Sequence, residues 1–226
     1  MDTEELVRRD FATGWGQIGQ AWGVAPSTAA VQGYLLMSSG SLTEAELRNA
    51  LGLSHRAAFT ALAQCEGWGL IEQVGSRRAG ARGPASRAWV AVADHWEWFR
   101  RVAGARKARE TDPILPLLDG CLRRAEALGA SDLAARVQAL LLFTHQFDGA
   151  LSAVVRSESA ALAHLFGALG QLEGPALERL LAVLTKVPEA ELAKAVRTLA
   201  TMRPTMVRGL VRLAGTPGIS RILATV

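Results

Sequence analysis

Two short strand-like patterns interrupt a chain that otherwise has the periodicity of helices. Residues 70–74 (LIEQV) and 87–93 (RAWVAVA) are rich in β-branched, apolar and aromatic side chains, and a Gly- and Arg-rich stretch, GSRRAGARGPAS, separates them. Elsewhere apolar residues recur three and four positions apart, as in DLAARVQALLLF, which is typical of packed amphipathic helices. The sequence therefore predicts a mainly α fold with one small β-hairpin whose tip is long.

Composition limits the class of protein. All six tryptophans lie within residues 1–99, whereas Ala, Leu and Arg dominate from about residue 96. Half of the 226 residues are hydrophobic, which excludes global disorder. The chain lacks both an 18-residue apolar stretch and an apolar segment behind its charged first residues, so we expect no membrane association, no signal peptide and a cytoplasmic location.

Motifs for catalysis and metal binding are missing from the sequence. Residues 14–19 (GWGQIG) have G-x-G-x-x-G spacing, but no strand precedes them and no acidic residue follows about 20 positions on. We interpret these glycines, with Gly23, as positions where helices approach closely. The four histidines are scattered, and Cys65 and Cys121 cannot form a disulfide framework or a four-ligand zinc site. We therefore expect no enzymatic activity, no cofactor and no metal ion.

A helix-start signal lies upstream of the hairpin. Thr43 and Glu46 have the spacing of a capping box, in which a hydroxyl and a carboxylate satisfy reciprocal backbone donors. Leu47 and Leu51, four positions apart, are expected to face inward. Gly52-Leu53-Ser54 then predicts a tight turn that ends this helix.

A second helix, HRAAFTALAQCEGWG, follows that turn. Ser54 is its natural N-cap, and three residues share its inner face: Ala58, Leu62 and Cys65. Helix, three-residue turn, helix and hairpin together form the layout of a winged helix-turn-helix. In that layout the second helix enters the DNA major groove, and the hairpin lies along the backbone or in the minor groove.

The residues from Trp22 to Gly75 carry a family resemblance. The stretch WGVAPSTAAVQGYLLMSSGSLTEAELRNALGLSHRAAFTALAQCEGWGLIEQVG resembles the DNA-binding core of bacterial MarR-type regulators, specifically the GbsR-like branch. The segment WEWFRRVAGARKARETDPILPLLDGCL is similar to the branch's linker helix and dimerisation region, and the resemblance covers about residues 10–150. It implies a homodimeric transcription factor that binds a pseudo-palindromic operator and represses transcription by occluding the promoter.

The expected DNA contacts lie on the second helix and on the hairpin. Arg56 is placed to pair with guanine O6 and N7. The Phe59 ring either contacts a thymine methyl or folds back into the protein, and the hairpin arginines either neutralise phosphates or belong to a solvated loop. The expected DNA-binding residues are Ser54, His55, Arg56, Ala57, Phe59, Thr60, Arg77, Arg78, Arg82 and Arg87. Five linker cations either flank the operator or solvate an exposed helix: Arg100, Arg101, Arg106, Lys107 and Arg109.

Clustered aromatic residues suggest a small-molecule effector site. One helix face carries Phe11, Trp15, Ile18 and Trp22, and the junction of hairpin and linker carries Trp89, Trp96 and Trp98. Aromatic walls hold quaternary ammonium groups by cation–π attraction, and the resembled branch includes a choline-responsive member. The alternative is that the rings pack a core or a dimer seam. The expected effector-binding residues are Phe11, Trp15, Trp22, Trp89 and Trp96.

We expect four regions along the chain. They are an N-terminal helix over 1–26, a winged helix-turn-helix over 27–95, linker and dimerisation helices over 96–155, and a region of short helices over 156–226. Prolines 175, 188, 204 and 217 each open a helical pattern there, and residues 192–226 carry six cations and no acid. This tail supports an alternative function, a protein-interaction scaffold that docks a partner through its basic C-terminal helices.

Overall fold

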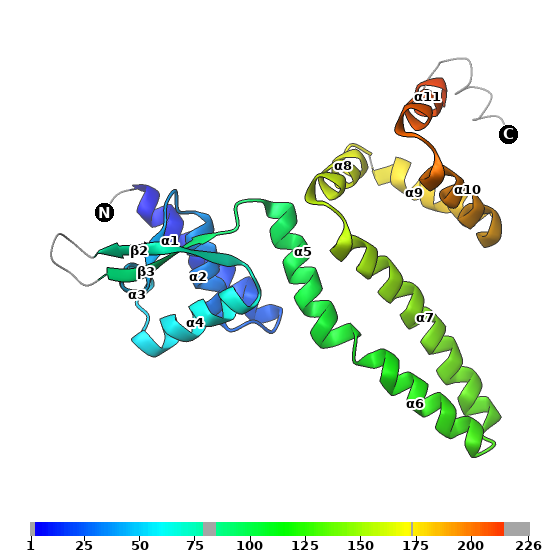
Figure 1. Ribbon diagram of the computed structural model, residues 1–226, viewed down its shortest axis with the longest axis horizontal. Coiled ribbons are helices and arrows are strands. Elements are labelled where there is room, and N and C mark those ends of the chain that lie inside the picture. The colour runs from blue at the N-terminus through cyan, green and yellow to red at the C-terminus, as the bar shows by residue number, and fades with distance from the viewer. Residues whose placement is uncertain (1–2, 79–84, 173, 215–226) are drawn as a thin grey trace. The chain divides into compact units, whose positions relative to one another are not determined.

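The computed structural model describes residues 3–78, 85–172 and 174–214, and the chain divides into two compact units, residues 1–165 and 166–226. The first unit holds, in chain order, α1 (Thr3–Ala21), α2 (Pro26–Leu36), β1 (Leu42–Thr43), α3 (Glu44–Leu51), α4 (His55–Gly67), β2 (Ile71–Arg78), β3 (Ala85–Ala91), α5 (His95–Arg106), the π-helical turn η1 (Lys107–Thr111), α6 (Ile114–Ala127), α7 (Ser131–Arg156) and most of α8 (Ser159–Gly170). The second unit holds the end of α8, then α9 (Gly174–Leu184), α10 (Glu189–Thr201) and α11 (Pro204–Ala214) (Figure 1).

Helices α1 and α2 pack closely because glycines face the contact. A Cβ on Gly16 would lie 3.0 Å from the Pro26 carbonyl oxygen, and a Cβ on Gly19 would overlap that of Ala29. The predicted close approach is confirmed at these two positions. It is wrong for Gly14, where a Cβ would meet nothing within 4 Å, and for Gly23, which instead adopts a φ of 73° after α1.

The two helices of the helix-turn-helix begin and end where local signals predict. Thr43 and Glu46 form a complete capping box at the start of α3. Gly52 ends that helix with a φ of 64°, a left-handed conformation that favours glycine. The Ser54 hydroxyl then accepts a 3.2 Å hydrogen bond from the Ala57 amide at the start of α4.

A three-stranded antiparallel sheet of order β1-β3-β2 completes the winged helix (Figure 1). Ile71 pairs with Ala91 in the predicted hairpin, whose strands extend further toward the tip than the pattern indicated. Gly75, with a φ of 94°, lies at an irregularity between Gln73 and Ser76. Strand β1 was not predicted, and its Leu42 pairs with Trp89 of β3. The fold is a mainly α winged helix-turn-helix with a helical extension.

The core of the first unit lies between the first four helices and the sheet. Leu47 and Cys65 are fully buried, and Leu62 is nearly so, which confirms the predicted inner faces of α3 and α4. Leu51 is half-buried and packs against this cluster. The buried cluster consists of Ala12, Val31, Tyr34, Leu35, Leu47, Ala61, Leu62, Cys65, Ile71 and Trp89.

The linker is built from several helical segments. Asp94 caps α5, which continues through η1 into α6, and the chain reverses at Gly129 into α7. Helix α7 returns to α5, where Arg100 Nη1 donates to the Val155 and Ser157 carbonyl oxygens at 2.9 and 2.8 Å. Lys107 Nζ also pairs with Asp148 Oδ1 at 2.8 Å. These contacts attach the α6–α7 hairpin to α5.

The second unit consists of short helices, as the proline spacing predicts. Pro175 and Pro204 lie at the starts of α9 and α11, Pro188 is the N-cap of α10, and Pro217 lies outside the described residues. None of the described side chains from Phe166 onward is buried. Across the described chain, no helix combines the length and apolar character needed to cross a membrane.

Candidate DNA-binding surface

Helix α4 is held by its inner face. Ala58, Ala61 and Cys65 are fully buried, and Cys65 Sγ donates to the Thr28 carbonyl oxygen of α2 at 3.5 Å. Burial raises the pKa of the Cys65 thiol to about 12. The Thr28 hydroxyl also donates to the Gln64 side-chain oxygen. These contacts fix α4 in the domain and leave its opposite face to solvent.

The solvent face of α4 carries most of the residues predicted to contact DNA. Ser54, His55, Arg56 and Thr60 are exposed, whereas Ala57 is half-buried. The Arg56 side chain has no hydrogen-bond or ion-pair partner among the described residues. His55 Nδ1 lies 2.9 Å from Glu44 Oε1 of α3, so one of the two ring nitrogens already has a partner within the protein. Arg56 is therefore the strongest candidate for a base contact on this face.

Phe59 projects from the same face. The residue is 64% exposed, and its ring centroid lies 6.5 Å from that of His55. The ring is thus not folded back into the core, and its predicted contact with a thymine methyl stays a prediction.

The hairpin of β2 and β3, called the wing from here on, carries further arginines near its tip. Arg77 and Arg78 form the end of β2, where they pair with Ser86 and Ala85 of β3. Arg87 is exposed on β3. Arg82 lies outside the described residues, as do the side chains of Arg77 and Arg78, so the predicted phosphate contacts stay predictions.

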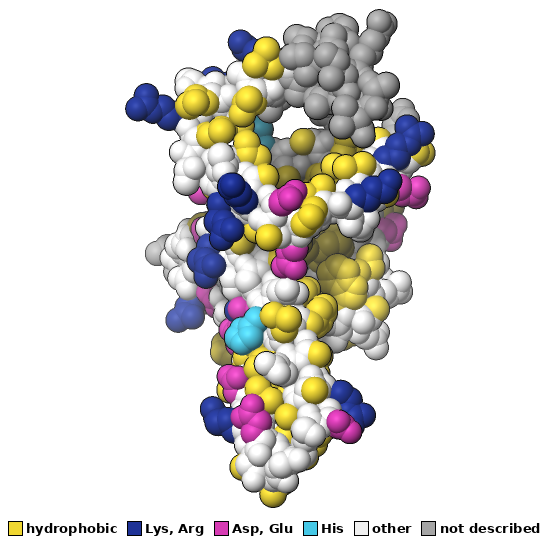
Figure 2. Space-filling model, turned by 90° about the vertical axis from the view of Figure 1, so that its right-hand side faces the viewer, with side chains coloured by type: hydrophobic (Ala, Val, Ile, Leu, Met, Phe, Trp, Pro, Cys, Tyr) yellow, Lys and Arg dark blue, Asp and Glu magenta, His cyan; other side chains and the backbone are white. Residues whose placement is uncertain are grey.

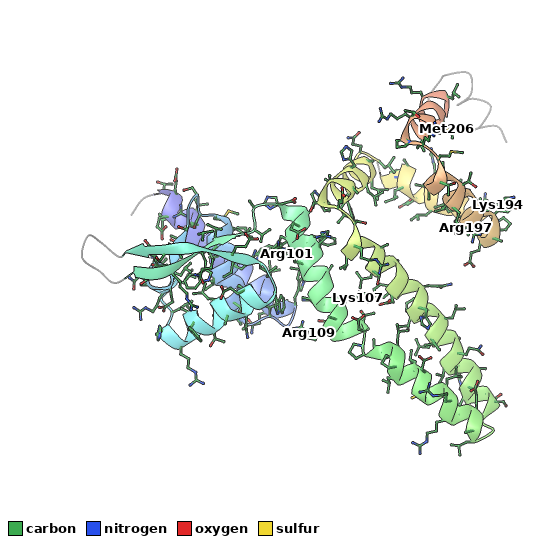
Figure 3. The ribbon with its side chains drawn as sticks, in the orientation of Figure 1. Arg101, Lys107, Arg109, Lys194, Arg197 and Met206 are labelled. Carbon is green, nitrogen blue, oxygen red and sulfur yellow. The ribbon has the colours of Figure 1, made fainter. Side chains whose placement is uncertain are left out.

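The five linker cations are occupied by contacts within the protein. Arg100 and Arg101 both pair with Glu97, at 2.7 Å each. Lys107 pairs with Asp148 of α7, and the Arg109 guanidinium lies 5.2 Å from the centre of the Trp68 ring (Figure 3). Arg106 donates to the Trp22 carbonyl oxygen at 2.8 Å. Arg100, Arg101, Arg106 and Lys107 are half-buried by these contacts, whereas Arg109 is exposed, and contact of any of the five with DNA stays a prediction.

An aromatic cavity lies between α1, α2, the C-terminal end of α4 and α5. Two of the predicted effector residues, Trp15 and Trp22, line this cavity. Other large apolar residues in its walls include Ile18, Trp68 and Trp98. Phe11 stacks on Trp15 at 5.5 Å from outside.

The structure places the other two predicted effector residues elsewhere. Trp89 belongs to the core beneath the sheet, and Trp96 packs edge-on against Phe99 at 6.1 Å. Sequence patterns also gave no indication of Gln32, which lines the cavity from α2. No cluster of three or more metal-ligating side chains occurs among the residues that the structure describes.

Comparison with known proteins gives likenesses in structure but none in sequence. No family model matches the chain, and no curated protein matches it. A crystal structure of a transcriptional regulator is similar to it, with 17% sequence identity, a TM-score of 0.49, and coverage of 66% of this chain and 95% of that one. The assignment of the fold rests on the order and pairing of this chain's own elements.

Proposed function

We propose that this protein is a sequence-specific regulator of transcription that reads duplex DNA with α4 and the wing. The observation that carries the proposal is the solvent face of α4, where Arg56 and Phe59 project from a helix whose opposite face is locked into the core. Major-groove readers present the early turns of the second helix in this way. The resemblance of residues 10–150 to MarR-type regulators, GbsR-like branch, supports the same reading and a repressor role.

The α6–α7 hairpin supports a homodimer. Leu133, Leu140, Phe143 and Phe147 form one stripe along α7 and are between 50% and 61% exposed. Figure 2 shows apolar side chains along this hairpin, at the lower end of the view. A second copy that covers this stripe would bury it, and a two-fold dimer of this kind reads two half-sites about 34 Å apart.

The aromatic cavity supports regulation by a small-molecule effector. Its walls include Trp68, which directly follows α4, and Leu70, which leads into β2. A ligand in the cavity would therefore contact the C-terminal end of α4, the helix that we propose reads DNA.

DNA binding is tested by selecting duplexes from a random library with the full chain and measuring fluorescence anisotropy on the selected and a scrambled duplex. We expect Arg56→Ala to reduce the preference for the selected duplex by about 1–3 kcal/mol, because one bidentate base contact is lost. Arg77→Ala/Arg78→Ala should weaken binding to both duplexes and flatten the salt dependence by about 0.9 in log-log slope per lost phosphate contact.

Arg123→Ala on α6 is the matched control, since it removes one exposed arginine away from α4 and the wing. It should leave both affinities unchanged. No enrichment of any duplex, or equal losses for Arg56→Ala and Arg123→Ala, would contradict the proposal.

A second candidate function is a scaffold that docks a protein partner. The observation that favours it is the second unit, where apolar side chains such as Leu181, Val196 and Leu210 are exposed beside basic ones. If this is the main role, shortening the chain to residues 1–170 should abolish partner binding, whereas a DNA reader should keep its affinity.

A further inference from the structure

The second unit has helices but no core of its own. Helices α9, α10 and α11 contain 11, 13 and 11 residues, and none of their described side chains is buried. The three helices also make few contacts with one another in the described part of the chain. Isolated helices shorter than about 12–15 residues are only marginally stable in water. These helices therefore need a further surface to stabilise them.

Each of the three helices presents an apolar face to solvent. Residues three or four positions apart lie on the same face of a helix, and each helix exposes such an apolar pair. The pairs are Leu177 and Leu181 on α9, Val196 and Leu199 on α10, and Met206 and Leu210 on α11. A surface that covers all three faces must itself be apolar.

Cations lie across the helix from the apolar faces of α10 and α11. Arg208 and Arg212 each come two positions after an apolar residue of α11, so they lie about 200° around the helix from it. Lys194 and Arg197 each come two positions before an apolar residue of α10 (Figure 3). All four are exposed, and none of the four side chains has a hydrogen-bond or ion-pair partner among the described residues. Their charge favours an anionic partner.

An anionic lipid bilayer supplies both of the required surfaces. Its acyl chains cover separate apolar faces without a groove of matching shape, and its headgroups neutralise cations on the polar faces. At about 1.5 Å per residue the helices are about 16–20 Å long, too short for a hydrocarbon core of about 30 Å. They would therefore lie along the membrane surface. The expectation of no membrane association rested on the lack of a spanning segment, which a surface helix does not need.

Other occupants fit these faces less well. Residues 192–226 carry six cations and no acid, so two copies of this unit would bring like charges together. Duplex DNA offers phosphates but leaves the apolar faces in water. A protein partner would need a groove that matches three short helices joined by turns.

We propose that α9, α10 and α11 bind the surface of an anionic phospholipid bilayer, with their apolar faces at the acyl-chain boundary and their Lys and Arg side chains among the headgroups. The two basic helices provide the charge preference, and all three provide apolar contact. Binding to lipid does not depend on DNA. That a DNA-reading chain would thereby be held at a membrane rests on the proposed function.

Co-sedimentation of the full chain with lipid vesicles, without DNA, tests the proposal. One set of vesicles is phosphatidylcholine alone, and the other contains equal parts of phosphatidylcholine and phosphatidylglycerol. We expect tighter binding to the second set. Arg208→Gln/Arg212→Gln should weaken that binding about 25-fold, about fivefold for each lost charge. Leu210→Gln should weaken it about tenfold, because an apolar side chain no longer leaves water.

Arg123→Gln/Arg124→Gln is the matched control, since it removes two exposed arginines from α6 of the first unit. It should bind vesicles as the native chain does. No binding to either set of vesicles, or equal losses in the two double variants, would overturn the proposal. Assembly beyond a dimer in lipid-free buffer that Leu210→Gln abolishes would assign these faces to further copies of the chain and would also overturn it. Failure of DNA binding would appear separately in the anisotropy experiment.

Discussion

At the scale of single residues, differences in surroundings give residues of the same type different roles. Gly14, Gly16 and Gly19 all lie in α1, but Gly16 and Gly19 are buried against α2, whereas Gly14 has open space around its Cα hydrogens. Cys65 and Cys121 differ in the same way, since the first is buried in the core and the second is exposed. Burial, rather than residue type, decides what each can tolerate or react with.

Gly19→Ala should lower the free energy of unfolding by about 1–3 kcal/mol, because the added methyl overlaps Ala29 and must push α1 from α2. Gly14→Ala in the same helix is the control and should stabilise by up to about 1 kcal/mol through better helix propensity. Urea denaturation monitored by circular dichroism measures both. Equal effects of the two substitutions would show that α1 does not pack as described.

The two cysteines should differ in reactivity toward a thiol reagent. The Cys65 thiol has its pKa raised to about 12 by burial, so it stays protonated and inaccessible at neutral pH. Cys121 is exposed on α6 and should react with one equivalent of Ellman's reagent. The second equivalent should react only after unfolding, and Cys121→Ser should remove the fast phase. Two fast equivalents in the native chain would contradict the described core.

At the scale of elements, α5 is attached to the winged domain and to α7 by an ionic network. Glu97 accepts from Arg100 and Arg101, whose guanidinium groups donate to carbonyl oxygens of Val155 and Gly69 respectively. These hydrogen bonds and charges hold the pKa of the Glu97 carboxyl below its usual 4.5. The network thus links the end of α4 to the end of α7 through one helix.

Glu97→Gln should lower the free energy of unfolding by about 1 kcal/mol at pH 7, since charge-assisted bonds are weakened in a partly exposed site. A lowered folded-state pKa contributes stability above the unfolded pKa, and this contribution is lost as the pH falls through the folded value. The deficit should therefore shrink below about pH 4.5. Urea titrations at several pH values measure it, with Glu126→Gln on α6 as the control. An equal deficit at pH 3 and pH 7 would contradict the network.

At the scale of the whole molecule, the core is confined to one of the two units. Every buried hydrophobic residue that the structure describes lies between Ala12 and Leu162. Helices α9, α10 and α11 leave apolar faces exposed, so they add little to the stability of the first unit. Folding and DNA reading are thus expected to be independent of the C-terminal helices.

A chain shortened to residues 1–170 should unfold cooperatively, with a free energy within about 0.5 kcal/mol of the full chain, because no described core residue is lost. It should also keep its affinity for selected DNA. Thermal and urea unfolding together with anisotropy measure these properties. Shortening to residues 1–150 is the contrasting control, since it removes the Val155 and Ser157 contacts to Arg100 and should destabilise the unit. Loss of cooperative unfolding in the chain of residues 1–170 would show that the first unit depends on the C-terminal helices.

Signals that act over three or four residues allowed much of the fold to be predicted from the sequence. The Thr43–Glu46 capping box, the Gly52 turn and the Ser54 cap define both helices of the helix-turn-helix, and alternation of side chains defines the hairpin. Such features depend on local geometry, so they can be recognised in the local sequence. The two residues of β1 are too few to show any alternation, which is why that strand was not foreseen.

The tertiary structure alone decided the contacts between distant residues. Arg106 and the Trp22 carbonyl oxygen are 84 positions apart, and Arg100 reaches a carbonyl oxygen 55 positions away, so the linker cations could not be assigned from their own segment. The exposure of Phe59 and the burial of Gln32 likewise depend on which helices pack together. Helical periodicity predicts that a face is buried but not which helix covers it. The aromatic cavity is formed where α1, α2, α4 and α5 meet, so only the tertiary structure could locate it.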